Sequence, residues 1–381
     1  MKGGKKKAAR QGAKREGLAA CAVLLAGGRG TRFWPRSRMR SPKQLLNIVG
    51  SRTMVRETLA RLGPLVAGRN TWVVTNREQA AAVRREVREV VPSHVLAEPA
   101  GANTAAAIGL AAVHLAHEHG DALMAVLPSD AYIADAEGYR KLVEAALELA
   151  RVPGNLVVMG IAPTRAETGY GYIERGEVAG RPRGVEAYAV RRFTEKPGLA
   201  DARAYVESGK YFWNAGMFFW RASTYLEKLQ QFLPATHEAL RELAGHIGSR
   251  RYTAKLHEIY PQLKNISVDY AVMEPATGEG EKSRVLVIPA KIGWSDIGSW
   301  AAVYELLAAK PGANVSAGEF FALDAEGNYF WSPKKFVGAI GVRDVVLVET
   351  EDALLVCSRE RSQDVGKIVK WLEEQRLSRL V

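Results

Sequence analysis

A short apolar segment that opens into a glycine-rich, basic loop constrains this chain more than any other feature. Residues 21–26 have the composition of a strand buried in a parallel sheet, and Gly27-Gly28-Arg29-Gly30 follows at once. Because glycine has no Cβ, the amide groups of such a loop can approach an anion closely. Arg32 and Lys43 add positive charge nearby. The pattern predicts a triphosphate or pyrophosphate site at the end of this strand.

The same segment excludes two common phosphate-binding loops. A Walker A loop would close with Gly-Lys-Ser/Thr, which is absent here. A dinucleotide fingerprint would need a third glycine where Phe33 stands. A plain strand-to-helix turn needs neither the nearby cations nor the Pro42-Lys43-Gln44 element. We therefore interpret the loop as a phosphate site of another class.

The order of apolar segments predicts the fold. Over residues 18–305, apolar runs alternate with helical patterns, which indicates βαβ units and a doubly wound, mostly parallel, Rossmann-like α/β sheet. Ligands of such sheets bind beyond the carboxyl ends of the strands. Over 306–381, short apolar runs are broken by Gly, Asp and Asn, which predicts a small β domain closed by an amphipathic helix over 364–377.

Positive charge is concentrated at the start of the chain. The net charge is +12, and residues 1–17 hold seven Lys or Arg and one Glu. We expect 1–17 to be a disordered basic tail that binds nucleic acid non-specifically at most. No apolar run reaches the roughly 20 residues of a membrane-spanning helix. With two cysteines, expected to be free thiols, the chain fits a cytoplasmic protein without a membrane partner.

Polar motifs follow several predicted strands. Asp130 comes directly after the apolar run 123–127, and Asp296 lies between two tryptophans. Mg²⁺ prefers one or two carboxylates together with phosphate oxygens, although Asp130 alone would also suit a helix cap. Glu98-Pro99 precedes Asn103-Thr104, a pattern typical of a capped helix start. Glu195-Lys196 before a proline sets an acceptor beside a cation, which suits a sugar phosphate.

Together these elements resemble the signature of the sugar-1-phosphate nucleotidylyltransferases. The resemblance rests on Leu25-Ala26-Gly27-Gly28-x-Gly30-Thr31-Arg32-Phe33-x-Pro35, Ser37-Arg38 and Pro42-Lys43-Gln44. The Trp-Pro-x-Ser-Arg and Pro-Lys-Gln portions are similar to the mannose-1-phosphate guanylyltransferase branch, and the likeness continues at intervals to about residue 300. It implies Mg²⁺-dependent, in-line transfer of GMP from GTP to α-D-mannose 1-phosphate. It also implies that the C-terminal β domain is a short left-handed β-helix.

The resemblance also implies roles for particular residues. The catalytic set is Arg32, Lys43, Asp130 and Asp296, and the two aspartates are also the metal ligands. The nucleotide-binding set is Leu25, Ala26, Gly27, Gly28, Gly30, Thr31, Arg32, Glu98, Pro99, Asn103 and Thr104. The sugar-phosphate set is Gly169, Glu195, Lys196 and Asn214. Asp269 matches a family motif too, but it suits a helix cap equally well, so it stays outside these sets.

Two other functions remain open at this point. The same chemistry can act on another pair, such as glucose 1-phosphate with UTP or dTTP. A catalytically silent regulatory subunit that binds a nucleotide sugar belongs to a different class, and the intact set of charged residues argues against it. We expect GTP and mannose 1-phosphate as ligands and a homodimer as the assembly. Some family members continue into a phosphomannose isomerase domain, and since this sequence stops at Val381 we expect that second activity to be missing.

Overall fold

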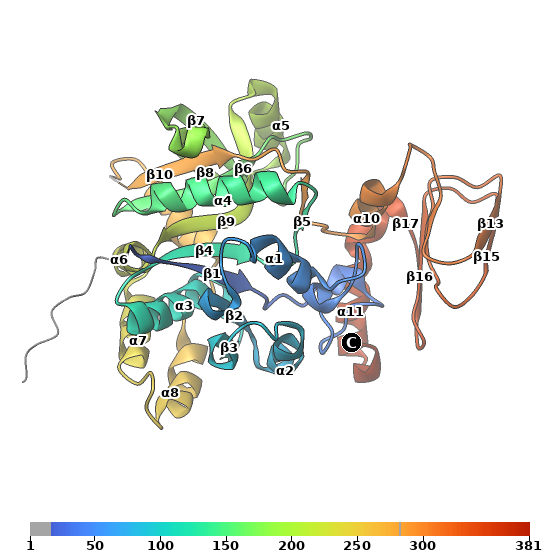
Figure 1. Cartoon of the computed structure of the whole chain (residues 1–381). Coiled ribbons are helices and arrows are strands. Elements are labelled where there is room, and N and C mark those ends of the chain that lie inside the picture. Colours follow the sequence, from blue (N-terminus) through green and yellow to red (C-terminus); the bar gives the residue numbers. More distant parts are fainter. Residues whose placement is uncertain (1–16, 282) are drawn as a thin grey trace, which may run out of the picture.

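A nine-stranded sheet forms the centre of the computed structural model, which describes residues 17–281 and 283–381 (Figure 1). The predicted basic tail lies outside the described residues, apart from Gly17. In sheet order the strands are β3 (Val95–Glu98), β2 (Thr71–Asn76), β1 (Ala19–Leu25), β4 (Ala122–Pro128), β9 (Tyr211–Arg221), β6 (Asn155–Ile161), β10 (Arg284–Pro289), β8 (Ala187–Glu195) and β7 (Gly171–Gly180).

Strand directions confirm the doubly wound, mostly parallel sheet. β1 runs parallel to β2 on one side and to β4 on the other. Within the described part of this sheet, every strand except β8 and β9 points the same way. The reversed β9 pairs with β7 near its start and with β4 near its end. Asn214 lies on β9 between these two paired stretches.

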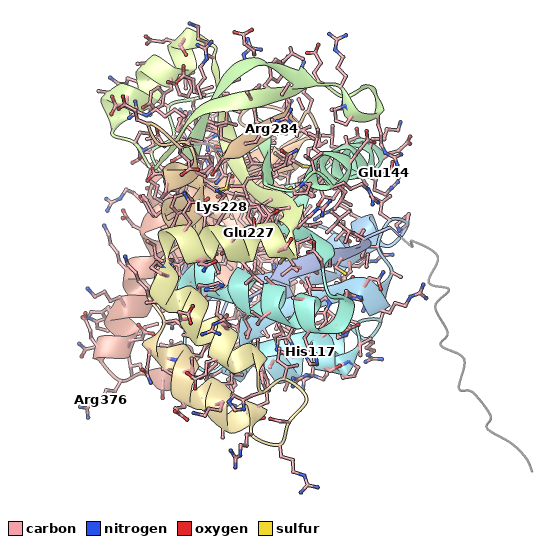
Figure 2. The ribbon with its side chains drawn as sticks, turned by 90° about the vertical axis from the view of Figure 1, so that its left-hand side faces the viewer. His117, Glu144, Glu227, Lys228, Arg284 and Arg376 are labelled. Carbon is pink, nitrogen blue, oxygen red and sulfur yellow. The ribbon has the colours of Figure 1, made fainter. Side chains whose placement is uncertain are left out.

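Helices cover both faces because β1 sends alternate side chains to opposite sides. Cys21 and Val23 pack in a core with α3 (Asn103–His119), α6 (Ala222–Phe232), α7 (Pro234–Ala244) and α8 (Tyr252–Ile259). Ala22 and Leu24 pack in a second core with α1 (Met54–Leu62), α2 (Arg77–Glu86) and α4 (Ala136–Ala150). Figure 2 shows the first of these faces, with His117 on α3 and Lys228 on α6.

The C-terminal region is built from short, mainly parallel strands that stack in coils. β12 (Val315–Ser316), β14 (Tyr329–Trp331) and β16 (Val345–Glu349) are parallel neighbours, and β13 (Phe320–Leu323) pairs in parallel with β15 (Val337–Ile340). β17 (Leu354–Ser358) closes the stack in the antiparallel sense. A 3₁₀ segment, Arg359–Asp364, then leads into α11 (Val365–Glu374), which lies beside the glycine-rich loop rather than beside the outer strands (Figure 1).

A third hydrophobic core joins this region to the start of the chain. Phe33 and Trp34, just after the glycine-rich loop, pack with Trp300 of α10 (Trp300–Leu307) and with Val365 and Val369 of α11. Helix α10 runs through residues 305 and 306, where the sequence predicts a domain boundary; that boundary stays a prediction. None of the helices in the described part of the chain is long and apolar enough to cross a membrane.

Candidate active site

A cavity of about 440 Å³ opens where β1, β3 and β4 end. The last residues of these strands, Leu25, Glu98 and Pro128, line it. The position agrees with the rule that parallel sheets bind ligands beyond their carboxyl ends. Of the predicted nucleotide-binding residues, the cavity wall contains Leu25, Gly27, Gly28, Glu98, Asn103 and Thr104. Those that do not line it are Ala26, Gly30, Thr31, Arg32 and Pro99.

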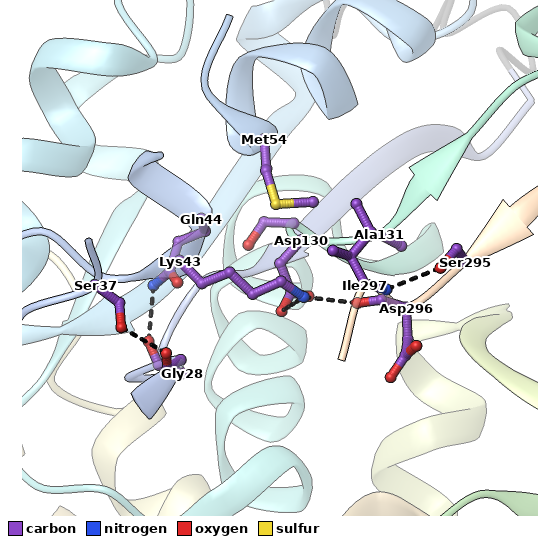
Figure 3. Close-up of polar contacts among 12 residues, drawn as sticks. Gly28, Ser37, Lys43, Gln44, Met54, Asp130, Ala131, Ser295, Asp296 and Ile297 are labelled. Atoms are coloured by element: carbon purple, nitrogen blue, oxygen red, sulfur yellow. Dashed lines mark hydrogen bonds and ion pairs between the residues drawn. The ribbon is translucent and has the colours of Figure 1, made fainter. Parts of the chain in front are cut away.

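The glycine-rich loop is fixed by buried hydrogen bonds beneath it. The Gln44 Nε2 atom donates to the carbonyl oxygen of Ala26 at 2.7 Å. It also donates to the carbonyl oxygen of Gly28 at 3.1 Å (Figure 3). The Ser37 hydroxyl donates to the Gly30 carbonyl at 2.6 Å. Because these carbonyls are turned toward the protein, the loop is held in one shape before any ligand arrives.

Lys43 links the loop to the two predicted metal ligands. Its side chain is 7% exposed, and its Nζ atom donates to Asp130 Oδ2 at 3.0 Å and to the main-chain oxygen of Asp296 at 2.6 Å (Figure 3). Of these two contacts, only the one with Asp130 is an ion pair, because the Asp296 atom is a main-chain oxygen. Carboxylate oxygens are the ligands that Mg²⁺ prefers, so the chemistry of the two aspartates fits the predicted metal.

The Asp296 side chain points away from Lys43 and contacts other residues. Its Oδ1 atom accepts a hydrogen bond from the Tyr170 hydroxyl at 2.7 Å. Burial, together with the Asp296 charge, raises the pKa of Tyr170, so this tyrosine stays a donor at neutral pH. A Cβ on Gly298 would lie 2.7 Å from Asp296 Oδ2 and 3.5 Å from Arg32 Nη1. The glycine therefore leaves room for the arginine to approach the aspartate.

Of the predicted sugar-phosphate residues, Glu195 and Asn214 lie against Gly171, and Lys196 pairs with Glu195. A Cβ on Gly171 would lie 2.5 Å from Glu195 Oε2 and 3.2 Å from Asn214 Cβ. Lys196 Nζ contacts Glu195 Oε1 at 2.6 Å. Asn214 donates from Nδ2 to Asp269 Oδ1 at 2.7 Å and accepts from the Gly216 amide at 2.9 Å.

Gly169 precedes Tyr170, whose main-chain oxygen accepts from the Lys196 amide at 3.2 Å, but Gly169 itself bonds elsewhere. Its amide donates to Glu167 Oε1 at 3.1 Å, and in the described structure no hydrogen bond joins it to Glu195, Lys196 or Asn214. Its predicted role in sugar-phosphate binding therefore stays a prediction. Gly171, two residues further on, is the glycine against which Glu195 and Asn214 pack.

The Glu195 carboxyl is poised to accept a hydrogen bond. Burial, with the nearby Asp269 charge, raises the pKa of Glu195 to about 7, and burial raises the pKa of Asp269 as well. Within the described residues, Glu195 Oε2 is buried and lacks a hydrogen-bond partner. A buried polar atom without a hydrogen-bond partner destabilises the folded protein. A ligand rich in hydroxyl groups would supply the missing hydrogen bond to Glu195 Oε2.

A second buried carboxyl, that of Glu98, lines the cavity itself, whereas Glu195 is not part of the cavity wall. Glu98 is buried, and its Oε1 atom accepts from the Tyr260 hydroxyl at 2.6 Å. Burial raises the pKa of Glu98 to about 7. A Cβ on Gly27 would lie 3.3 Å from Glu98 Oε2, so this second oxygen faces the glycine-rich loop.

Comparison with known proteins gives the chain its family. A nucleotidyl transferase model matches residues 21–311, and a model described as "MannoseP isomerase/GMP-like beta-helix domain" matches residues 318–372. A mannose-1-phosphate guanylyltransferase of Salmonella muenchen is 40% identical over 92% of this chain and 73% of its own length. One from Escherichia coli K12 is 38% identical over 92% of this chain and 73% of its own length. The chain belongs to the mannose-1-phosphate guanylyltransferase family.

A solved structure supports the same assignment over nearly the whole chain. A protein of Thermus thermophilus, described as "mannose-1-phosphate geranyltransferase", matches with a TM-score of 0.83 and 36% identity. The match covers 93% of this chain and 100% of that one. The predicted nucleotidyltransferase fold and the C-terminal β-helix are thereby confirmed, and the chain is an enzyme of this family.

Three polar residues of this nucleotidyltransferase site were missed by the sequence analysis. Tyr170 bonds Asp296, Tyr260 bonds Glu98, and Gln363 Oε1 accepts from Arg32 Nη1 at 2.7 Å. Tyr170 stands inside a Gly-Tyr-Gly motif that the sequence offered as a signal. Tyr260 and Gln363 had no local signal, because each lies more than 160 residues from its partner.

Asp269, which the sequence left undecided, belongs to the cavity. It lines the wall, fixes Asn214 by a hydrogen bond and begins a π-helical turn, Asp269–Met273. Such turns are frequent at functional sites because they displace one residue from the regular helical position.

Proposed function

We propose that the enzyme transfers GMP from GTP to α-D-mannose 1-phosphate and releases GDP-mannose and pyrophosphate. The observation that carries this proposal is the position of Lys43. Its ammonium bridges Asp130, which lines the cavity, and the main chain of Asp296. The names of the similar proteins support the same substrates.

The chemistry asks the protein to position its substrates rather than to abstract a proton. An oxygen of the sugar phosphate attacks the α-phosphorus of GTP, and the bond between that phosphorus and the bridging oxygen to the β-phosphate breaks. The nucleophile is already an anion, so no general base is needed. Rate enhancement comes from aligning two polyanions and stabilising the charge that builds up in the transition state.

Glu98 is suited to read guanine. The Watson–Crick edge of guanine places its N1–H and its 2-amino group side by side as donors, and an ionised carboxylate accepts from both. Adenine presents an acceptor at N1, which a carboxylate repels. Asn103 and Thr104 line the same cavity, and together with Pro99 they would complete the part of the site that binds the base.

The loop and its cations are assigned to the phosphates. The main chain from Leu25 and Ala26 through Gly27, Gly28, Gly30 and Thr31 would cradle them, with Arg32 at the β- and γ-phosphates. Lys43 would contact the α-phosphate from its buried position. On the sugar side, Lys196 would pair with the phosphate while Glu195 and Asn214 bind hydroxyl groups and Gly169 contributes its main chain.

Asp130 and Asp296 would hold Mg²⁺. When bound, the ion supplies charge neutralisation and polarises phosphate oxygens. Tyr170 fixes the orientation of the Asp296 carboxylate through its hydrogen bond. Lys43 restrains Asp130 in the same way.

We further propose that the enzyme works as a homodimer in the cytoplasm. Cys21 and Cys357 are free thiols, and burial raises the pKa of Cys21 to about 12, so it is unreactive and suits a reducing compartment.

A matrix assay tests the proposed function. Pyrophosphate release is measured for GTP, ATP, UTP and dTTP, each combined with mannose 1-phosphate and glucose 1-phosphate. We expect release with GTP and mannose 1-phosphate, and a loss of about 100-fold or more in kcat/KM for Lys43→Met, which keeps the apolar stem but removes the charge. Release confined to UTP or dTTP with glucose 1-phosphate would replace the proposed substrates. Binding of a nucleotide sugar without release from any pair would indicate a regulatory subunit.

A further inference from the structure

The C-terminal region, from β12 to α11 and called the C-terminal module below, contacts the phosphate-binding loop through two side chains, one neutral and one negatively charged. Gln363, in the 3₁₀ segment Arg359–Asp364, accepts a hydrogen bond from Arg32. Glu373, near the end of α11, forms an ion pair with Arg29 at 2.5 Å. Two arginines of one loop therefore meet the same module, one through a neutral acceptor and the other through a carboxylate.

We propose that Gln363 is a positioning residue that holds the Arg32 guanidinium toward the pyrophosphate end of the site without neutralising its charge. The inference rests on the proposed function, since it assumes that Arg32 binds the β- and γ-phosphates. Arg32 is exposed, and a free arginine side chain samples many rotamers. An acceptor on an anchored segment of the chain restricts that freedom before the nucleotide binds.

The neutral amide matters because of what Arg32 must do next. A carboxylate at this place would form a charge-assisted pair with the guanidinium and would compete with phosphate oxygens for the same N–H groups. An amide oxygen accepts one hydrogen bond and adds no charge. Arg29 is already paired with the Glu373 carboxylate. The two arginines therefore differ in how much positive charge remains available to a phosphate group.

Gln363 can position Arg32 because its own segment is anchored. The neighbouring Ser362 is buried, and its hydroxyl accepts from the Ala301 amide at the start of α10. On the other side, Val365 is buried in the core that contains Phe33, the residue after Arg32. A Cβ on Gly366 would lie 3.3 Å from Thr31 Oγ1 and 3.8 Å from Arg32 Cγ, so α11 packs directly against the loop.

The test combines an isosteric charge change with a matched control. Gln363→Glu adds a carboxylate at the Arg32 contact. Gln375→Glu adds the same charge one residue after α11, at an exposed side chain. We expect Gln363→Glu to raise KM for GTP, and for pyrophosphate in the reverse reaction, about tenfold. KM for mannose 1-phosphate and the melting temperature should stay close to wild type, and Gln375→Glu should match wild type throughout.

A double variant separates positioning from a merely structural role. If Gln363 acts through Arg32, Gln363→Glu has no further effect on KM for GTP in an Arg32→Gln background. Equal effects in both backgrounds, an effect of Gln375→Glu equal to that of Gln363→Glu, or a parallel rise in all KM values would overturn the inference.

Direct binding keeps the two hypotheses apart. Pyrophosphate and GTP affinities are measured by calorimetry for wild type, Gln363→Glu and Gln375→Glu. Weaker binding confined to Gln363→Glu supports the inference even if wild type fails to turn over GTP with mannose 1-phosphate, in which case the proposed function alone fails. Unchanged binding in an active enzyme overturns the inference and leaves the function standing.

Discussion

At the scale of single residues, Gly30 determines where Lys43 can lie. Gly30 has a φ of 61°, in the left-handed region that favours glycine, and a Cβ there would stand 2.4 Å from Lys43 Cβ. The loop and the lysine are 13 positions apart in sequence but in close contact in space. The glycine thus lets the backbone pass directly over the residue that bridges the two aspartates.

Gly30→Ala should therefore destabilise the enzyme and displace Lys43. We expect the free energy of unfolding in urea to fall by about 2 kcal/mol, from the strained φ and the clash together. Gly28→Ala is the control for stability, since open space surrounds its Cβ position, and its change should stay within about 0.5 kcal/mol. Equal stability of the two variants would contradict the contact.

Glu98 gives a prediction about pH. Since burial raises its pKa to about 7, the carboxylate that would accept from guanine becomes populated as pH rises through 7. We expect kcat/KM for GTP to rise about tenfold from about pH 6 to about pH 8 relative to Glu98→Gln, in which this group no longer titrates. Parallel pH profiles for the two proteins would count against Glu98 as the base reader.

The same shift has an opposite consequence for folding. The folded-state pKa lies above the ordinary value of 4.5, so folding takes up a proton between pH 4.5 and about 7. The stability of wild type relative to Glu98→Gln should be highest below pH 4.5, fall as pH rises toward 7 and stay constant above. Urea unfolding of both proteins across this range measures the difference.

Some of the residues that the sequence predicts for the site lie together in the structure, but the sequence did not indicate their hydrogen-bond partners. Lys43, Asp130 and Asp296 lie together as their chemistry suggested. The Arg32–Gln363 contact spans 331 positions and leaves no local pattern. The packing of Glu195 and Asn214 against Gly171 could not be predicted from sequence, because the three residues lie on different strands.

At the scale of elements, strand β1 and helix α4 differ in how well the sequence defined them. The apolar run of β1 marked the strand well because both of its faces are buried. The sequence favours a start of helix α4 near Gly138, because glycine is a poor residue for a helix interior, yet α4 begins at Ala136. Asp135 caps it by accepting from the Gly138 amide at 2.8 Å, and a Cβ on Gly138 would stand 2.2 Å from Asp135 Oδ2. The glycine therefore makes room for the cap and does not mark the helix start.

Asp135→Ala should lower the free energy of unfolding by about 1 kcal/mol, because the first turn of α4 loses its acceptor. Asp201→Ala, in the first turn of α5 (Leu199–Ser208), is the matched control and should change stability by less than about 0.5 kcal/mol. Urea titrations of both variants provide the measurement. A loss at Asp201 as large as that at Asp135 would show that charge near a helix start, rather than the cap, is responsible.

At the scale of the whole molecule, the β-helix exposes apolar side chains that suit a second copy of the chain. Phe321, Phe336 and Ile340 are 56%, 64% and 68% exposed, on or next to β13 and β15. These two strands pair with each other, and in the described structure neither has a further neighbour. An isologous contact between two such faces would cover them symmetrically.

The dimer prediction follows from this face. The double change Phe336→Ser with Ile340→Ser should shift the enzyme from dimer to monomer in sedimentation velocity, while Val178→Ser, an exposed apolar position on β7, should not. A wild type that sediments as a monomer at micromolar concentration would refute the predicted assembly. No strict repeat in the sequence marked the β-helix itself, which is why only the family resemblance suggested it.

Phe33, Trp300 and Val369 share one hydrophobic core, so the phosphate-binding loop depends for its support on the C-terminal end of the chain. We expect heat or denaturant that loosens the C-terminal coils before the central sheet to remove support from the loop. Loss of nucleotide binding should then serve as an early report of damage at the periphery. The nucleotidyltransferase domain and the C-terminal region would also have to be inherited together. Exchanging either one would leave the apolar side chains of this core without the residues against which they pack.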